Sequence, residues 1–245
     1  MSRVRRIRTV RVAPATETGA HAGLAYALWL PEREPRGGVV VLHGAGSCKE
    51  NHHDFARAAF GAGFAAVAFD QRGHGDSDGP MDGRAIDDVA TIAAMLRRRV
   101  GGEAPIALRG SSMGGYLAIV AGAGAGAAAV VAICPAPAQG LRRALARSQL
   151  GFDADREELD ALLAAHELER HVAALTAPLL LLHAEGDEQV PVEHSRELAK
   201  LLVSPASRLV TVPGGHHRSI QHDGELQALS LRFIERALAE RATGP

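Results

Sequence analysis

Residues 105–115 decide the fold, and they read Pro-Ile-Ala-Leu-Arg-Gly-Ser-Ser-Met-Gly-Gly. The apolar start of this stretch predicts a buried strand, and a helix is expected to follow as far as about Gly122. Between them, residues 110–114 match the pattern G-x-S-x-G in the strand–turn–helix context that it requires. Such a turn lifts its central side chain clear of the sheet, at a helix N-terminus that favours developing negative charge. Ser112, at the centre, is the candidate nucleophile, and Ser111 is expected to be its neighbour only.

Short apolar runs alternate with helical patterns through the rest of the chain. The expected strands are 24–30, 39–42, 64–69, 105–108, 128–133, 179–183 and 208–212, and the other expected helices are 50–62, 82–100, 192–202 and 224–241. Buried strands separated by helices are typical of βαβ units, so the sequence predicts an α/β protein with a mostly parallel, doubly wound sheet. The basic stretch 1–12 is expected to add an eighth, edge strand, followed by a turn-rich segment at 14–23. No helix pattern separates the first two strands, which predicts an antiparallel N-terminal edge.

One segment departs from this alternation. Residues 136–177 separate two strands by about forty residues, and charged positions alternate there with apolar ones. Connections of this length often form lids or specificity elements. We therefore expect a single domain over 1–245 with a small helical lid at 136–177; one crossover helix with a long approach loop is the alternative.

Composition excludes several classes of protein. The 245 residues are 47% hydrophobic and 22% charged, and the formal net charge of −1 argues against nucleic acid as a partner. No uninterrupted apolar stretch of about twenty residues is present, so we expect no membrane span. Cys48 and Cys134 lie far apart without metal-ligand spacing, which favours a reduced, cytoplasmic protein. The neighbouring His52 and His53 are expected to pack in a loop rather than bind metal.

A serine nucleophile needs a base, and the base needs an acid to orient it. For the G-x-S-x-G turn the chain order is serine, then Asp or Glu, then His. Asp187 follows the expected strand 179–183, and His217 follows the expected strand 208–212. All three residues are therefore expected at the same edge of the sheet, where ligands bind. Glu185 and Glu188 compete with Asp187 for the role of the acid.

The motifs, taken together, resemble the α/β-hydrolase superfamily over nearly the whole chain. Residues 43–46, His-Gly-Ala-Gly, resemble its HGxG loop, and residues 70–77, Asp-Gln-Arg-Gly-His-Gly-Asp-Ser, resemble its D-x-R-G-x-G-x-S segment. Residues 186–191, Gly-Asp-Glu-Gln-Val-Pro, resemble its G-D-x-x-V-P acid loop. The small size is similar to that of compact esterases, including feruloyl-esterase-like and monoacylglycerol-lipase-like enzymes.

The resemblance implies further roles. The oxyanion hole is expected to use the backbone N–H groups of Met113 and Ala45, with Gly46 as the alternative to Ala45. The family's histidine loop reads Gly, two residues, His, which from Gly214 gives His217. Reading the preceding Gly-His pair instead gives His216 as the base.

These residues predict a serine hydrolase that cleaves carboxylic esters of small to medium acyl groups through an acyl-enzyme intermediate. The expected partner is a small-molecule ester, and no metal or organic cofactor is required. Thioesterase, peptidase or carbon–carbon hydrolase activity on the same triad is the alternative. A non-catalytic ligand-binding protein of this fold is a further alternative. The sequence does not specify an oligomeric state.

Overall fold

The computed structural model describes residues 12–242 and contains an eight-stranded sheet. The strands are β1 (Glu17–His21), β2 (Leu24–Trp29), β3 (Gly38–Leu42), β4 (Ala65–Phe69), β5 (Ile106–Ser111), β6 (Ala127–Ile133), β7 (Leu179–Ala184) and β8 (Arg208–Val212). Their order across the sheet is β1-β2-β4-β3-β5-β6-β7-β8. The pairs β1–β2 and β2–β4 are antiparallel and the remaining pairs are parallel. The predicted α/β class and antiparallel N-terminal edge are confirmed.

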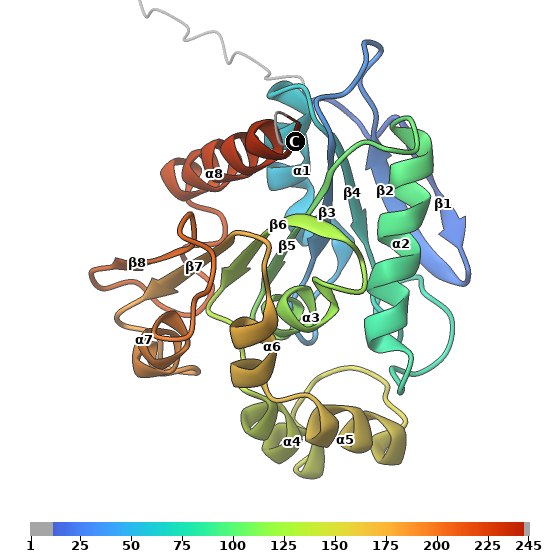
Figure 1. Cartoon of the computed structure of the whole chain (residues 1–245). Coiled ribbons are helices and arrows are strands. Elements are labelled where there is room, and N and C mark those ends of the chain that lie inside the picture. The colour runs from blue at the N-terminus through green and yellow to red at the C-terminus, as the bar shows by residue number, and fades with distance from the viewer. Residues whose placement is uncertain (1–11, 243–245) are drawn as a thin grey trace, which may run out of the picture.

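Helices cover both faces of this sheet (Figure 1). They are α1 (His53–Gly61), α2 (Ala85–Arg99), α3 (Met113–Ala121), α4 (Ala138–Ala146), α5 (Arg156–Ala165), α6 (Leu168–Ala174), α7 (Val192–Ala199) and α8 (Gly224–Ala242), with a 3₁₀ turn at Lys49–His52. Side chains alternate between faces along each strand. In β3, Val40 and Leu42 join the apolar cluster of α2 and α3, whereas Val39 and Val41 join that of α1 and α8. The sheet is therefore doubly wound, as predicted.

The first strand differs from its predicted position. Residues 1–11 lie outside the described residues, so the edge strand expected at 1–12 is not tested there. The stretch 14–23, expected as a turn, instead contains β1. A two-residue turn at Ala22 and Gly23, both with positive φ, folds β1 back onto β2 and matches the hairpin type that favours such residues. Local composition suggested a turn because this short strand carries Gly19 and is largely exposed.

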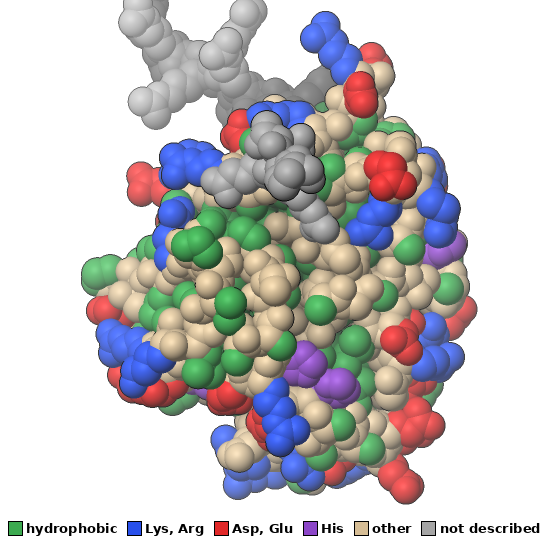
Figure 2. Space-filling view, in the orientation of Figure 1, with side chains coloured by type: hydrophobic (Ala, Val, Ile, Leu, Met, Phe, Trp, Pro, Cys, Tyr) green, Lys and Arg blue, Asp and Glu red, His purple; other side chains and the backbone are tan. Residues whose placement is uncertain are grey.

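The long connection 136–177 contains α4, α5 and α6. Arg142 on α4 makes two hydrogen bonds to the Asp160 carboxylate on α5, at 2.8 and 2.9 Å. The loop between these helices contacts the body of the protein, since the Met81 amide donates to the Asp153 carbonyl at 2.9 Å. Figure 2 shows charged side chains of both signs at this end of the molecule. That the segment acts as a lid stays a prediction.

None of the helices in residues 12–242 combines the length and apolarity that crossing a bilayer demands. The two cysteines are free thiols.

Candidate active site

Ser112 occupies a strained turn between β5 and α3. Its φ of 54° and ψ of −118° lie in a region that non-glycine residues rarely adopt. Three backbone hydrogen bonds hold this conformation: the Ser112 amide donates to the Ile133 carbonyl at 2.8 Å, and its carbonyl accepts from Tyr116 and Ala136 at 3.0 and 3.1 Å. The strain is therefore fixed by three neighbouring segments, and the serine side chain reaches a cavity.

Glycines make this turn possible because backbone passes close on both sides. A Cβ atom on Gly110 would lie 2.0 Å from the Gly114 carbonyl oxygen. A Cβ atom on Gly114 would lie 2.4 Å from the carbonyl oxygen of His43. The second contact brings the start of α3 against the His43–Gly46 loop, so the glycines of the motif place the two segments together.

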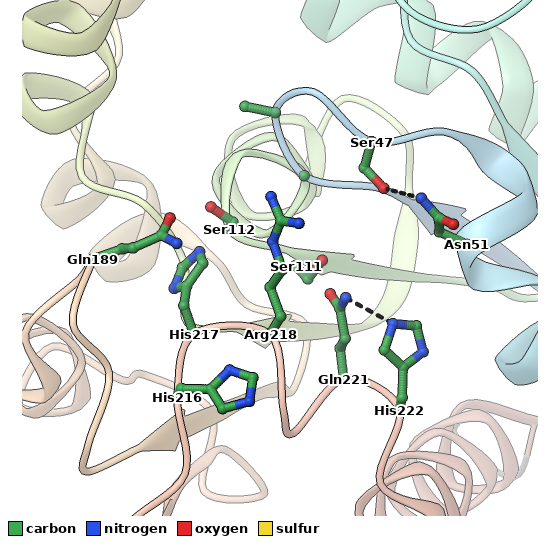
Figure 3. A pocket seen from close by; sticks show the side chains of 12 residues that line it. Ser47, Asn51, Ser111, Ser112, Gln189, His216, His217, Arg218, Gln221 and His222 are labelled. Atoms are coloured by element: carbon green, nitrogen blue, oxygen red, sulfur yellow. Dashed lines mark hydrogen bonds between the residues drawn. The ribbon is translucent and has the colours of Figure 1, made fainter. Parts of the chain in front are cut away.

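The histidine predicted as base meets the predicted acid. His217 Nδ1 lies 2.7 Å from Asp187 Oδ2, and both side chains are buried. A carboxylate only accepts, so Nδ1 carries the proton and Nε2 has a free lone pair. His217 and Ser112 line the same cavity, and Figure 3 shows the imidazole and the hydroxyl directed toward the same part of it. His216 also lines the cavity, but its ring points away from Ser112 (Figure 3).

The Asp187 carboxylate is held by four groups. Its Oδ1 accepts from the amides of Gln189 and Val190 at 2.8 and 2.9 Å. Burial opposes ionisation, but hydrogen bonds from His183, His217 and these amides outweigh it and hold the pKa of Asp187 below its ordinary value. The group therefore stays anionic while it orients His217.

The competing carboxylates have other partners. Glu185 pairs with Arg196 at 3.2 Å on the surface. Glu188 accepts the backbone N–H of His217 at 3.2 Å. The structure thus brings Asp187, and neither glutamate side chain, to the His217 ring.

His183 was not identified from the sequence. This fully buried residue lies at the end of β7, with Nε2 2.9 Å from the Val190 carbonyl and 3.4 Å from Asp187 Oδ2. Because the carbonyl only accepts, Nε2 carries the proton and Nδ1 accepts from the Ser195 hydroxyl at 2.7 Å. Its position after an apolar strand was visible in the sequence, but its contacts depend on tertiary packing.

Of the two expected oxyanion donors, Ala45 lines the cavity and Met113 directly follows the cavity-lining Ser112. Gly46 donates its N–H to His74 Nε2 at 3.2 Å, so that group is engaged. Within residues 12–242, no hydrogen bond is made by the N–H groups of Ala45 and Met113. His43 organises the loop, since its Nε2 accepts the Gln71 amide at 3.0 Å. The geometry thus favours Ala45 over Gly46 as the second donor.

One group of side chains in the described region has metal-ligand spacing. Ligand atoms of Cys134, His183 and Asp187 lie within 4.8 Å of one another. Both ring nitrogens of His183 and the carboxylate already have hydrogen-bond partners. Burial raises the pKa of the Cys134 thiol, which disfavours the thiolate that a metal would need. These residues therefore fit a hydrogen-bonded cluster better than a metal site.

The cavity itself is of moderate size, about 450 Å³. Its lining residues are Gly44, Ala45, Ser47, Asn51, Ser111, Ser112, Gln189, His216, His217, Arg218, Gln221 and His222. Seven of them lie in the sequence motifs or the histidine loop, and the sequence analysis missed Ser47, Asn51, Arg218, Gln221 and His222. Ser47, directly after Gly46, and Arg218, directly after His217, were the missed residues with readable positions.

The chain is similar in sequence to known hydrolases. A family model described as "Serine aminopeptidase, S33" matches residues 33–152, and one described as "TAP-like protein" matches residues 163–236. A monoacylglycerol lipase of Mycolicibacterium smegmatis is 26% identical over 241 residues, spanning 79% of this chain and 85% of the relative.

Solved structures share the fold. Est1E from Butyrivibrio proteoclasticus with bound ferulic acid has a TM-score of 0.70 at 21% identity, covering 94% of this chain and 100% of that one. The monoacylglycerol lipase of Paleococcus ferrophilus has a TM-score of 0.67 at 22% identity, covering 88% and 98%. In its fold and in its matches to both family models, this chain is similar to the serine hydrolases of the α/β-hydrolase superfamily.

Proposed function

We propose that this chain is a carboxylic ester hydrolase that cleaves esters of small to medium acyl groups through Ser112, His217 and Asp187. The observation that carries the proposal is the 2.7 Å hydrogen bond from His217 to Asp187, beside a cavity that His217 shares with Ser112. The relative named as a monoacylglycerol lipase and the structural neighbour with bound ferulic acid support ester chemistry.

The mechanism follows from which groups can give and take protons. Ser112 attacks the ester carbonyl while His217 Nε2 takes its proton, and Asp187 stabilises the resulting imidazolium. The N–H groups of Ala45 and Met113 hold the oxyanion, and each such donor typically contributes a factor of about 10²–10³ in rate. His217 then protonates the leaving alcohol, and water releases the acyl group by the same steps.

Polar lining supports small to medium acyl groups. Of the residues that line the cavity, only Ala45 has a hydrocarbon side chain. A long acyl chain gains affinity by burying methylenes against hydrocarbon groups, at about 0.8 kcal/mol each, and Ala45 is the one lining residue that supplies a hydrocarbon side chain.

A peptidase is the second candidate, because one matching family model is described as a serine aminopeptidase. An aminopeptidase must bind the α-ammonium group of its substrate, for which a carboxylate is the natural partner. None of the cavity-lining residues is Asp or Glu, and one is Arg. We therefore favour esters over peptides with a free amino terminus.

The test is a chain-length series of p-nitrophenyl esters, with alanine p-nitroanilide alongside. We expect maximal kcat/KM between acetate and octanoate, and no measurable anilide cleavage. A preference for acyl chains longer than about ten carbons would contradict the size assignment, and cleavage of the anilide alone would favour the peptidase.

We also place the protein in the cytoplasm. The two free thiols support this location, because disulfides are the usual state of paired cysteines in oxidising compartments.

A further inference from the structure

Arg218 gives the cavity an unbalanced positive charge. It is the one Lys or Arg among the lining residues, and no Asp or Glu lines the cavity with it. The remaining polar lining groups are hydroxyls, amides and histidines. A substrate entering this cavity therefore meets one permanent cation and no compensating carboxylate on its walls.

The Arg218 guanidinium has no protein partner. Within residues 12–242 it makes no hydrogen bond, ion pair or contact with an aromatic ring. Two buried arginines elsewhere show the contrast: Arg72 binds the Asp88 carboxylate at 2.8 and 3.0 Å, and Arg109 donates to a backbone carbonyl at 2.9 Å. Figure 3 shows Arg218 extending alongside His217, with its guanidinium in the cavity on the side of Ser112.

The three amide side chains that line the cavity have hydrogen-bond partners. Asn51 donates its side-chain amide to Ser47 at 3.0 Å, and the Gln221 amide lies 2.8 Å from a ring nitrogen of His222. The Gln189 side chain hydrogen-bonds to Glu188. Among the amide and charged side chains of the cavity, the Arg218 fork is thus the one without a partner in residues 12–242.

We propose that Arg218 is a specificity-determining residue that selects esters carrying an anionic oxygen group, a carboxylate or a phosphate, close to the scissile carbonyl. A guanidinium is permanently charged and presents paired N–H donors that match two oxygens of such a group. The proposal rests on the proposed ester hydrolysis by the same cavity. Monoesters of small dicarboxylic acids place the anion in the acyl half, and esters of glycolate or of glycerol phosphate place it in the alcohol half.

The experiment compares matched anionic and neutral substrates on the full-length protein. Monomethyl succinate is paired with methyl pentanoate, and butyryl glycolate is paired with ethyl butyrate. The ratio of kcat/KM within each pair is measured for wild type and for Arg218→Gln. Arg98→Gln is the control, since Arg98 is exposed on α2 and does not line the cavity.

We expect Arg218→Gln to lower the anionic-to-neutral ratio of at least one pair by about 10-fold, as for losing one hydrogen-bonded charge partner. Arg218→Lys is expected to recover part of the ratio, because it keeps the charge and loses the fork. Arg98→Gln is expected to leave the ratio unchanged. The pair that responds identifies the half of the substrate that carries the anion.

Salt gives a second readout. Arg218 is exposed, so raising NaCl from 0.05 to 0.5 M is expected to lower the wild-type ratio and to change that of Arg218→Gln little. Equal losses on the anionic and neutral members of both pairs in Arg218→Gln would overturn the proposal, since Arg218 would then serve the reaction in general.

A binding measurement separates this proposal from the proposed function. Monomethyl succinate and butyryl glycolate are each titrated calorimetrically into Ser112→Ala and into Ser112→Ala/Arg218→Gln, neither of which is expected to turn them over. Tighter binding of either ligand to the protein that retains Arg218 supports the anion site even if ester hydrolysis fails. Equal binding of both ligands to the two proteins would contradict the anion site even if esters are hydrolysed.

Discussion

The two adjacent histidines at 216 and 217 show how one residue's contacts decide its role. Both line the cavity, but His217 alone makes the 2.7 Å hydrogen bond to Asp187 that fixes its tautomer. The backbone N–H of His216 instead donates to the hydroxyl of nearby Ser219 at 2.9 Å. Neighbouring positions in one loop thus present very different chemistry.

We therefore predict opposite outcomes for two equivalent substitutions. His217→Gln is expected to lower kcat on p-nitrophenyl butyrate by about 10³-fold or more, because the general base is lost. His216→Gln is expected to stay within about 10-fold of wild type. Steady-state kinetics on the three proteins decide between them, and the reverse ranking would move the base to His216.

At the scale of elements, a partly buried ion network joins the start of the 3₁₀ turn to the loop after β4. Lys49 Nζ lies 2.7 Å from carboxylate oxygens of both Asp70 and Asp76, and Asp70 is fully buried. Burial opposes the charge on Lys49, but these carboxylates raise its pKa above the ordinary value. The network fixes two segments that flank the His43–Gly46 loop.

Removing this lysine is expected to be costly. Lys49→Met leaves the buried Asp70 charge uncompensated, and we expect a loss of about 3 kcal/mol in the free energy of unfolding. Lys200→Met is the matched control, because Lys200 is exposed and pairs with Glu197 at the surface, so a change within about 0.5 kcal/mol is expected. Urea unfolding measures both; equal effects would show that the network contributes no more than a surface pair.

The sequence predicted some elements better than others, for physical reasons. The turn at Ser112 was predictable because its steric demands are local and require glycines two positions away on each side. Asp187 and His217 were predictable because each follows a buried strand, and parallel strands end at one edge. β1 was not, because a short exposed strand has no apolar alternation. His183 and Arg218 were not predictable, because whether their side chains have partners depends on segments that are distant in the sequence.

At the scale of the whole molecule, buried neutral histidines couple folding to pH. Burial lowers the pKa of His43 to about 4 and that of His52 to about 3, and neighbouring cationic groups add to the effect. The unfolded chain protonates these residues near pH 6.5, so it binds more protons than the folded state between pH 6.5 and 4. The stability that their neutral state provides is therefore lost as pH falls below 6.5.

The expected loss of unfolding free energy at low pH follows from this linkage. Each residue is expected to cost about 1.8 kcal/mol between pH 7 and pH 5, so the two together should lower the free energy of unfolding by about 3.6 kcal/mol over that range. His52→Gln is expected to remove about half of this difference, because glutamine does not titrate. Urea unfolding at the two pH values tests it, and a variant with the full wild-type pH dependence would exclude His52 as a source.

The most direct test of the account is the hydrolysis of p-nitrophenyl butyrate by wild type, Ser112→Ala and Ser111→Ala. Both serines line the cavity, but only Ser112 occupies the strained turn. The account predicts that Ser112→Ala loses activity by about 10³-fold or more and that Ser111→Ala stays within about 10-fold of wild type. Activity that survives in Ser112→Ala would contradict the assignment of the nucleophile, and with it the proposed mechanism.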